Sequence, residues 1–456
     1  MARLRTLFST ALMSDEAPVG PRDPDEGASA VQMDDMILVS IDDHMVEPPD
    51  MWKNHVPAKY ADQVPKVVRN DQGVDQWVFQ GNATSTPFGM AATVGWPNDQ
   101  WGFNPGSYSE LRPGCFDVHE RVRDMNVNGV LASMNFPTMA GWNARTFAES
   151  KDKDLGLAML RGYNDWVIDE WCAAYPGRFI PLGLVPMWDI DLAVAEIHRI
   201  GKKGCRSISF VETPHVQGYE SFLSGYWDPM FKALCEENMV LSLHIGAGFE
   251  VIRRPKEAPI DHLMVLACQI SAITAQDLLF GPTLRRFPDL KVALSEGGIG
   301  WIPFYFDRID RHYSNQVWLH EGSEGFGDKK PSDVFKEHIL ACFITDPSGL
   351  KLRHDIGIEN IAWECDYPHT DTTWPESPEL LWKEFEGAGV TVDSEINAIT
   401  FENACRFYGW DPFQHTPREQ ATVGALRSLA KDVDVTRMSR EEWKAQNEAA
   451  GIGVFD

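Results

Sequence analysis

Eight short, nearly continuous apolar runs recur along the chain, and they constrain its fold more than any other feature. They cover residues 37–41, 130–134, 180–185, 207–210, 240–243, 292–294, 342–344 and 361–363. Strands that are apolar on both faces are typical of a parallel sheet covered by helices. Helix-like patterns lie between most of the runs, at residues 155–175, 192–200, 226–237 and 264–287. This alternation predicts an α/β fold of the (β/α)8 TIM barrel type. No glycine-rich phosphate or dinucleotide fingerprint follows a run to favour an open sheet instead.

The segment between the first and second runs is longer than a barrel requires. It holds about 90 residues, and loops of this length are usually lids or binding loops. Five of its aromatic residues have two possible roles, which the sequence leaves open: they line a binding pocket, or they anchor the loop to the barrel. They are Trp77, Phe79, Trp96, Trp101 and Phe103.

The chain divides into three predicted parts. Residues 1–35 are rich in Pro, Gly, Ala and acidic side chains, which predicts a disordered or extended N-terminal arm. Residues 36–410 form the predicted barrel, with the long first loop included. Residues 411–456 are rich in charged side chains and are predicted to form a C-terminal helical extension. This extension either wraps a neighbouring subunit or lies on the surface of its own chain.

Charge and cysteine usage exclude several classes of function. The chain carries 67 acidic and 41 basic residues, a formal net charge of -26, which repels nucleic-acid phosphates and anionic membrane surfaces. No apolar run approaches the roughly 18 residues needed to span a bilayer. The eight cysteines are scattered without a CxxC pair, which indicates reduced thiols. We therefore predict a cytoplasmic protein with no nucleic-acid or membrane partner.

Chemistry-bearing side chains gather at the ends of three predicted strands. The first run ends in SIDDHMVEPPDMW, where Asp42 and His44 are two residues apart and therefore share a face. His244 ends the fifth run, and the eighth run is followed by Asp366, His369 and Asp371. Because barrel enzymes build their active sites at the carboxyl ends of the strands, these residues predict one mixed nitrogen and oxygen metal site. Such a site suits Zn²⁺ first, with Mn²⁺ or Fe²⁺ as alternatives.

Each of these residues also has a structural interpretation when taken alone. A single histidine at a strand end is more often a hydrogen-bonded structural residue than a ligand. Asp42 or Asp43 alone could cap a helix or form a turn. The metal hypothesis rests on their joint occurrence at the ends of the first, fifth and eighth strands.

The sixth run supplies one more carboxylate. In LKVALSEGGIGWIPF, Glu296 comes at the strand end, directly before two glycines that allow a close approach of substrate. It could be a further ligand, a general base for a metal-bound water, or a proton donor if burial raises its pKa. The structural alternative is an ion pair with Arg308 on the following helix.

An ordered set of segments resembles a known family. The segments are SIDDHMVEPPDMW, RVRDMNVNGVLASMNFP, YNDWVIDEWCAAYPGRFIPLGLVP, LSLHIGAG, RRFPDLKVALSEGGIGWIPFYFDRID, WECDYPHTDTTWP and ENACRFYGW. Together they resemble the amidohydrolase-related group of the amidohydrolase superfamily, of the aminocarboxymuconate-semialdehyde decarboxylase and resorcylate decarboxylase type. The resemblance implies one divalent metal ion, commonly zinc or manganese, bound by Asp42, His44, His244 and Asp366.

The sequence departs from this family at the sixth strand. Decarboxylases of the group generally carry a histidine before the Gly-Gly pair and use it as the acid/base, whereas Glu296 stands here. An ionised glutamate would repel a substrate carboxylate unless the metal or a raised pKa compensates.

Two enzyme hypotheses and one non-enzyme hypothesis follow. The first is a metal-dependent carboxy-lyase that removes CO₂ from an aromatic or conjugated cyclic acid, with Glu296 or His369 delivering the proton. The second is a hydrolase of an amide, lactone or carbon–carbon bond, in which Asp366 or Glu296 takes a proton from a metal-activated water. The third, a non-catalytic barrel, predicts a broken ligand set. We expect a small aromatic or cyclic substrate and a homodimer or higher homo-oligomer.

Overall fold

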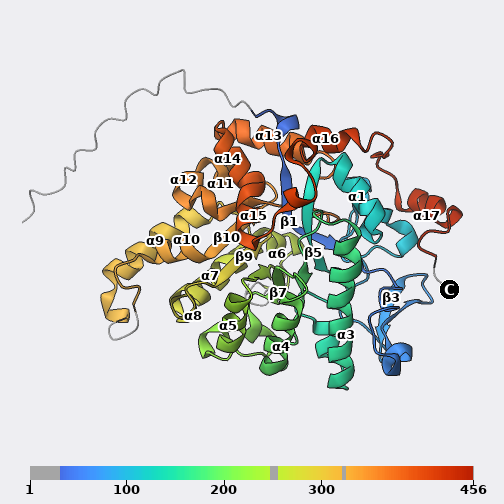
Figure 1. Ribbon diagram of the computed structural model, residues 1–456, viewed down its shortest axis with the longest axis horizontal. Helices are drawn as coiled ribbons and strands as arrows, with labels where there is room; N and C mark the ends of the chain where they lie inside the picture. The colour runs from blue at the N-terminus through green and yellow to red at the C-terminus, as the bar shows by residue number, and fades with distance from the viewer. Residues whose placement is uncertain (1–30, 247–254, 321–324, 455–456) are drawn as a thin grey trace, which may run out of the picture.

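Each of the eight apolar runs forms a strand in the computed structural model of the chain, which describes residues 31–246, 255–320 and 325–454. The strands are β1 (Leu38–Met45), β5 (Val130–Pro137), β6 (Leu182–Gly183), β7 (Ser207–Val211), β8 (Val240–His244), β9 (Lys291–Ser295), β10 (Ile339–Phe343) and β11 (Ile361–Trp363). They run parallel, and the helices surround them (Figure 1). The predicted (β/α)8 barrel is thus confirmed.

The barrel closes through backbone hydrogen bonds at two seams between the regular ladders. β6 to β11 form one six-stranded sheet, and β1 pairs with β5. The N–H of Ile180 donates to the carbonyl oxygen of Ser133 at 2.9 Å, which joins β5 to the segment before β6. The N–H of Asp366 donates to the carbonyl oxygen of Asp42, also at 2.9 Å, which joins β11 to β1.

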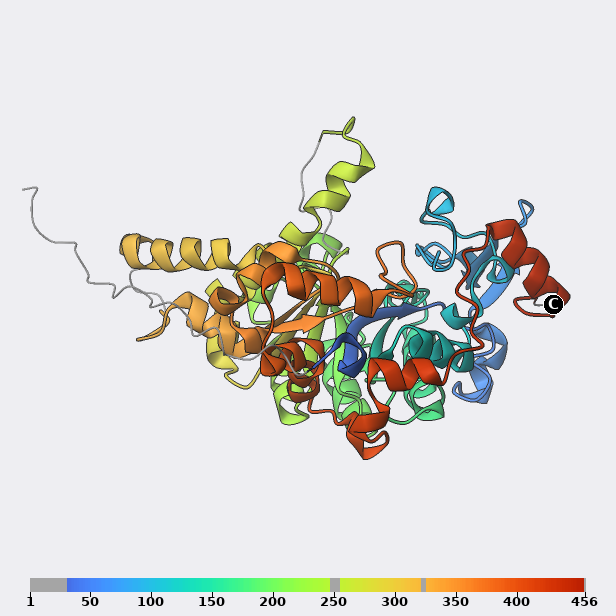
Figure 2. The same ribbon diagram turned by 90° about the horizontal axis from the view of Figure 1, so that it is seen from above.

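The helices cover the outside of the barrel. The larger ones are α1 (Val118–Val127), α3 (Lys153–Trp166), α4 (Ile190–Gly201), α5 (Asp228–Glu236), α6 (Ile260–Leu266), α7 (Cys268–Phe280), α9 (Ile302–Asn315), α10 (Pro331–His338) and α13 (Ser377–Ala388). The shorter ones are α2 (Arg145–Ala148), α8 (Thr283–Arg286), α11 (Pro347–Lys351), α12 (Arg353–Ile356), α14 (Asp393–Asn397) and α15 (Asn403–Tyr408). The predicted helix over residues 264–287 is divided into α6, α7 and α8: the chain bends at Ala267 between α6 and α7, and Gly281 and Pro282 separate α7 from α8. α6 projects away from the barrel (Figure 2).

A β-bulge in β1 decides which way its polar residues point. Ser40 pairs with Ser133 and Asp43 pairs with Asn135, so β1 holds one residue more than β5 between these pairs. Val39 and Ile41 pack in the cluster that fills the barrel interior. Without the extra residue, strict alternation would turn Asp42 to the opposite face from Ile41. The bulge therefore allows Asp42 and His44 to point inward together.

The long first loop contains a small antiparallel sheet that the apolar runs did not indicate. It consists of β2 (Lys66–Arg69), β3 (Asp75–Phe79) and β4 (Asn82–Ala83). Trp77, Phe79 and Trp96 are buried in the main core and anchor the loop. Trp101 and Phe103 instead line a cavity at the barrel mouth. Both roles that the sequence left open are therefore present, in different residues.

The residues after the barrel pack on their own chain. α16 (Val423–Ser428) lies against α1, and α17 (Arg440–Ala449) lies beside the first loop, near β3 in Figure 1. The side-chain amide of Asn447 donates to the carbonyl oxygens of Ser109 and Leu111, both at 2.9 Å. At the other end of the chain, the described part of the expected arm includes a single 3-10 turn, Met33–Asp35, while residues 1–30 lie outside the described residues.

Two further sequence predictions concern membrane-spanning helices and the state of the cysteines. No single described helix is long and apolar enough to cross a bilayer, and α6 with α7 reaches that length and composition only as a pair bent by 44°. All eight cysteines are free, as their spacing predicted.

Candidate metal centre

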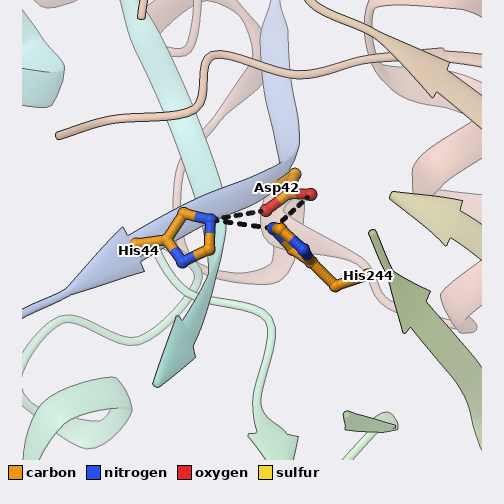
Figure 3. A group of neighbouring side chains, drawn as sticks. All are labelled: Asp42, His44 and His244. Atoms are coloured by element: carbon orange, nitrogen blue, oxygen red, sulfur yellow. Dashed lines mark hydrogen bonds and ion pairs between the residues drawn. The ribbon is translucent and has the colours of Figure 1, made fainter. Parts of the chain in front are cut away.

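Asp42, His44 and His244 converge inside the barrel mouth (Figure 3). The Nε2 atoms of the two histidines are 3.0 Å apart. Asp42 lies against both: its Oδ1 is 3.4 Å from His44 Nε2, and its Oδ2 is 3.5 Å from His244 Nε2. All three side chains are buried, with at most 1% of each exposed. Residues about 200 positions apart in sequence thus present three ligand atoms to one point.

Asp366 and His369 complete the group from the other side. Asp366 Oδ1 lies 3.5 Å from His44 Nε2 and 3.0 Å from His369 Nδ1. The rings of His44 and His369 are stacked, with their centroids 3.7 Å apart. The structure therefore brings together the four residues that the sequence predicted as ligands, Asp42, His44, His244 and Asp366, and it places His369 beside them.

Burial keeps the three imidazoles neutral. It lowers the pKa of His44 well below the ordinary value, and it lowers the pKa of both His244 and His369 to about 3. The Nδ1 of His244 contacts the carbonyl oxygen of Ile245, so the proton of the neutral ring belongs on Nδ1. This leaves the Nε2 lone pair of His244 directed at Asp42, which is the state that a metal ligand requires.

The carboxylates are the strongest indication that this group holds a cation. Neither oxygen of Asp42 or of Asp366 has a hydrogen-bond partner among the residues that the structure describes. Burial, followed by repulsion from neighbouring carboxylates, raises the pKa of both groups well above the ordinary range. Buried acceptors without donors are costly. A divalent ion at this point would supply the missing positive charge, so the residues present fit such an ion.

Glu296 stands on the wall of the same site. Its Oε2 lies 3.5 Å from His244 Nε2, and its side chain is 23% exposed. Burial and the nearby Asp366 and Glu364 raise its pKa well above the ordinary value. Glu296 and Asp366 both adopt positive φ angles, 58° and 57°, which are uncommon outside glycine. Local strain of this kind, of order 1–2 kcal/mol, is concentrated at functional sites.

Glu364 is a site residue that the sequence prediction missed. It follows β11 directly, is fully buried, and its pKa is raised to about 8 by burial. Its Oε2 accepts the backbone N–H of Glu296 at 3.2 Å and the Sγ–H of Cys342. The sequence does carry a signal for Glu364: it lies two residues before Asp366, and residues two apart at a strand end share a face.

Trp142 is the second residue that the prediction missed. Its indole is stacked on the imidazole of His244, with centroids 4.6 Å apart and an angle of 13° between the planes. The segment that carries it is fixed by Glu47, whose carboxylate accepts the backbone N–H groups of Thr138, Met139 and Ala140. No apolar run or motif marks Trp142, because its role depends on where β8 lies.

A cavity of about 710 Å³ opens above the group. Its lining includes polar side chains, from Glu296, Glu364, Asp366, His369 and Asp371, and aromatic ones, from Trp101, Phe103 and Trp142. Apolar walls with a few convergent polar groups are typical of small-molecule sites. The arrangement is suited to a flat, apolar molecule with a polar end directed at the ligand group.

Comparison with known proteins identifies the family. The sequence profile described as Amidohydrolase matches residues 51–410, most of the chain. The chain belongs to the amidohydrolase family. The expected resemblance is therefore confirmed at the level of the family. The prediction of an enzyme of the amidohydrolase type is confirmed with it.

Individual relatives are distant. The chain is 29% identical over 155 residues to a 2-amino-3-carboxymuconate-6-semialdehyde decarboxylase of Caenorhabditis elegans, a match that spans 33% of this chain and only 31% of that protein. It is 24% identical over 293 residues to a gamma-resorcylate decarboxylase of Polaromonas, covering 59% of this chain and 83% of that one. Among solved structures, it is similar to a dihydroxybenzoic acid decarboxylase from Polaromonas with bound manganese and the inhibitor 2-nitroresorcinol. The TM-score is 0.53 at 18% identity, over 84% of this chain and 99% of that one.

Proposed function

We propose that this amidohydrolase is a metal-dependent carboxy-lyase that removes CO₂, without oxidation, from a small aromatic or conjugated cyclic carboxylic acid. The observation that carries the proposal is the position of an acid, Glu296, beside a ligand group on the wall of an aromatic-lined cavity. The decarboxylase names of the similar proteins support it.

Asp42, His44, His244 and Asp366 would hold one divalent ion. Zn²⁺ is the ion that we expect first, and Mn²⁺ or Fe²⁺ also suits a donor set of imidazole nitrogens and carboxylate oxygens. When bound, this ion would act as a Lewis acid and template for the substrate carboxylate and an adjacent hydroxyl. Manganese in a structure of similar fold supports the class of ion.

Glu296 is the proton donor in this proposal. Burial raises its pKa, which favours the uncharged acid and so weakens its repulsion of the substrate carboxylate. It gives its proton to the ring carbon as the carbon–carbon bond to CO₂ breaks and the bonding electrons return to the ring. Glu296 is then an anion and regains a proton from water. His369 is the weaker donor, because its pKa of about 3 leaves no proton to give as an imidazolium.

Trp101, Phe103 and Trp142 hold the ring. Their side chains line the cavity from two segments, the first loop and the segment after β5, and aromatic walls bind flat ligands by stacking and by excluding water. Exclusion of water matters for the reaction, since it strengthens the electrostatic interactions of the buried acids.

A hydrolase remains the second candidate. The observation that favours it is Glu296 itself, because a carboxylate at this strand end could accept a proton from water as readily as supply one. In that reaction Asp366 or Glu296 takes the proton of the attacking water, and an amide, lactone or carbon–carbon bond is cleaved.

One experiment separates the two reactions. Purified protein loaded with Mn²⁺ or Zn²⁺ is incubated with a panel of hydroxybenzoates in ¹⁸O-labelled water, and the products are examined by mass spectrometry. Release of CO₂ with no label in the aromatic product supports the carboxy-lyase. Labelled oxygen in a cleaved product would support the hydrolase and overturn the first proposal.

We also propose that the chain works in the cytoplasm as a homodimer or a higher homo-oligomer. Exposed apolar side chains on and after α9 support self-association: Phe304 is 71% exposed and Trp318 is 70% exposed. Light scattering on the purified protein tests the oligomeric state, and a monomer at micromolar concentration would contradict it.

A further inference from the structure

A second cavity, of about 660 Å³, adjoins the metal cavity. Three residues, Met90, Trp142 and Gly246, line both cavities. They therefore form the wall between the two spaces, and the indole of Trp142 is the largest side chain in that wall.

Shape and stacking hold Trp142 in this wall. One face of the indole stacks on His244. The indole also lies close to the backbone of Gly246, whose φ angle is 123°. A Cβ built at Gly246 would lie 2.5 Å from Cζ3 of Trp142. A side chain at position 246 would thus displace the indole. Among the described residues, the indole N–H has no hydrogen-bond partner, so no hydrogen bond opposes such a displacement.

The second cavity differs from the first in its chemistry. Its lining includes Thr138, Asn143 and Tyr219, which offer hydroxyl and amide groups. Its cation, Arg145, is paired with Glu149 at 2.7 Å, so the two charges offset one another. This lining suits uncharged groups that form hydrogen bonds, such as hydroxyls and amides.

We propose that Trp142 determines the length of substrate that the enzyme accepts. Its indole closes the metal cavity around a one-ring acid and blocks the second cavity. That cavity is a binding site for an uncharged extension bearing hydroxyl or amide groups, which a ligand reaches when the indole is absent or displaced. The proposal rests on the proposed function, since it requires the ring of the ligand to sit at the ligand group.

Four substitutions, two of them also combined in a double variant, separate this role from a merely structural one. Trp142→Ala removes the wall, and Trp142→Phe keeps an aromatic ring against His244. Gly246→Ala displaces the indole without removing it. Tyr219→Ala, alone and combined with Trp142→Ala, changes the lining of the second cavity only.

Binding is measured by calorimetry on the Mn²⁺-loaded protein with two probes. One is 2-nitroresorcinol. The other is a two-ring analogue, in which an amide links the same nitroresorcinol ring to a dihydroxyphenyl group. Binding of Mn²⁺ alone is measured for every variant, because a loss of the His244 contact would appear there first.

We expect Trp142→Ala and Gly246→Ala to tighten binding of the two-ring probe by about tenfold or more, the scale on which pocket walls discriminate. Binding of 2-nitroresorcinol should weaken, because Trp142 also lines the metal cavity, and binding of Mn²⁺ should change by less than about threefold. Adding Tyr219→Ala to Trp142→Ala should reverse part of the gain. Equal effects on both probes, or no gain for the longer one, would overturn the role of Trp142 alone. Failure of every protein to bind either probe would overturn the proposed function as well.

Discussion

The backbone N–H of Asp366 donates to the carbonyl oxygen of Asp42 at 2.9 Å, and the N–H of His44 donates to the carbonyl oxygen of Tyr367 at 2.6 Å. These two hydrogen bonds join β11 to β1 and fix the spacing of the Asp42 and Asp366 carboxylates. Arg121 supports the same seam, since its guanidinium donates to the carbonyl oxygens of His44 and Gly114 and lies over the ring of Tyr367. The ligand group is therefore tied to the closure of the fold itself.

Asp366→Asn should remove the bound metal ion and leave the fold intact. The amide keeps the shape of the side chain but supplies no negative charge, and metal sites of this class need it. We expect the metal content to fall from near one ion per chain to less than about one tenth, measured by elemental analysis. Asp371→Asn, in the same cavity but outside the ligand group, is the control and should retain its metal. Full retention of metal by Asp366→Asn would contradict the ligand assignment.

Glu296→Gln should lower turnover by about 10²- to 10⁴-fold if Glu296 donates the proton, because an amide cannot do so. Metal content should be unchanged, and a fall in it would instead make Glu296 a ligand. Glu296→His should restore much of the lost turnover, since imidazole also transfers protons. Near-normal turnover of Glu296→Gln would exclude both roles.

The free energy of unfolding should decrease as the pH falls below 6.5, and His338 should account for part of this decrease. This histidine is buried at the end of α10, its Nδ1 lies 2.7 Å from the carbonyl oxygen of Leu290, and burial lowers its pKa below the ordinary 6.5. The unfolded chain then binds more protons than the folded one as the pH falls below 6.5, so the free energy of unfolding decreases with falling pH.

His338→Asn keeps a donor for Leu290 and removes the titration. Chemical unfolding between pH 7 and pH 5 should therefore show a smaller loss of stability for the variant than for the natural protein. The same substitution at exposed His215 provides the comparison. An identical pH dependence for all three proteins would show that His338 does not contribute.

Asn447→Ala should destabilise the contact between α17 and the first loop by about 1–3 kcal/mol, because two buried carbonyl groups lose their donor. Its exposed neighbour Gln446 offers a matched control, for which Gln446→Ala should change stability by less than about 0.5 kcal/mol. Thermal unfolding measures both. A melting temperature for Asn447→Ala equal to that of the control would contradict the anchoring role.

The sequence was sufficient to predict the barrel, because each strand is buried on both faces and stands out as an apolar run. The sequence was a weaker guide to the bounds of short strands and to strands that are exposed. The third run was expected over residues 180–185, yet β6 spans only Leu182–Gly183 because Pro181 has no N–H to pair. The sheet of the first loop was missed because β2 is mostly exposed and β4 has two residues.

The site shows the same division. Asp42, His44, His244, Glu296 and Asp366 were predicted because each lies near or just beyond the carboxyl end of a strand, and these ends meet at one mouth of a barrel. The bulge that directs Asp42 inward depends on the register between β1 and β5, which no local pattern specifies. Trp142 and Glu364 act through neighbours from other strands, so their roles required the folded structure.

The packing of α17 on the first loop has a consequence for the order in which the enzyme is completed. Residues 438–447 hold the stretch from Gly95 to Leu111, and that stretch carries Trp101 and Phe103 over the cavity. Trp101 and Phe103 leave the ribosome before β5 and the later strands of the barrel, and α17 leaves it after all of them. The cavity therefore takes its final form only after synthesis of the barrel has finished. A fusion or a proteolytic cut beyond residue 430 would alter substrate binding without touching the ligand group.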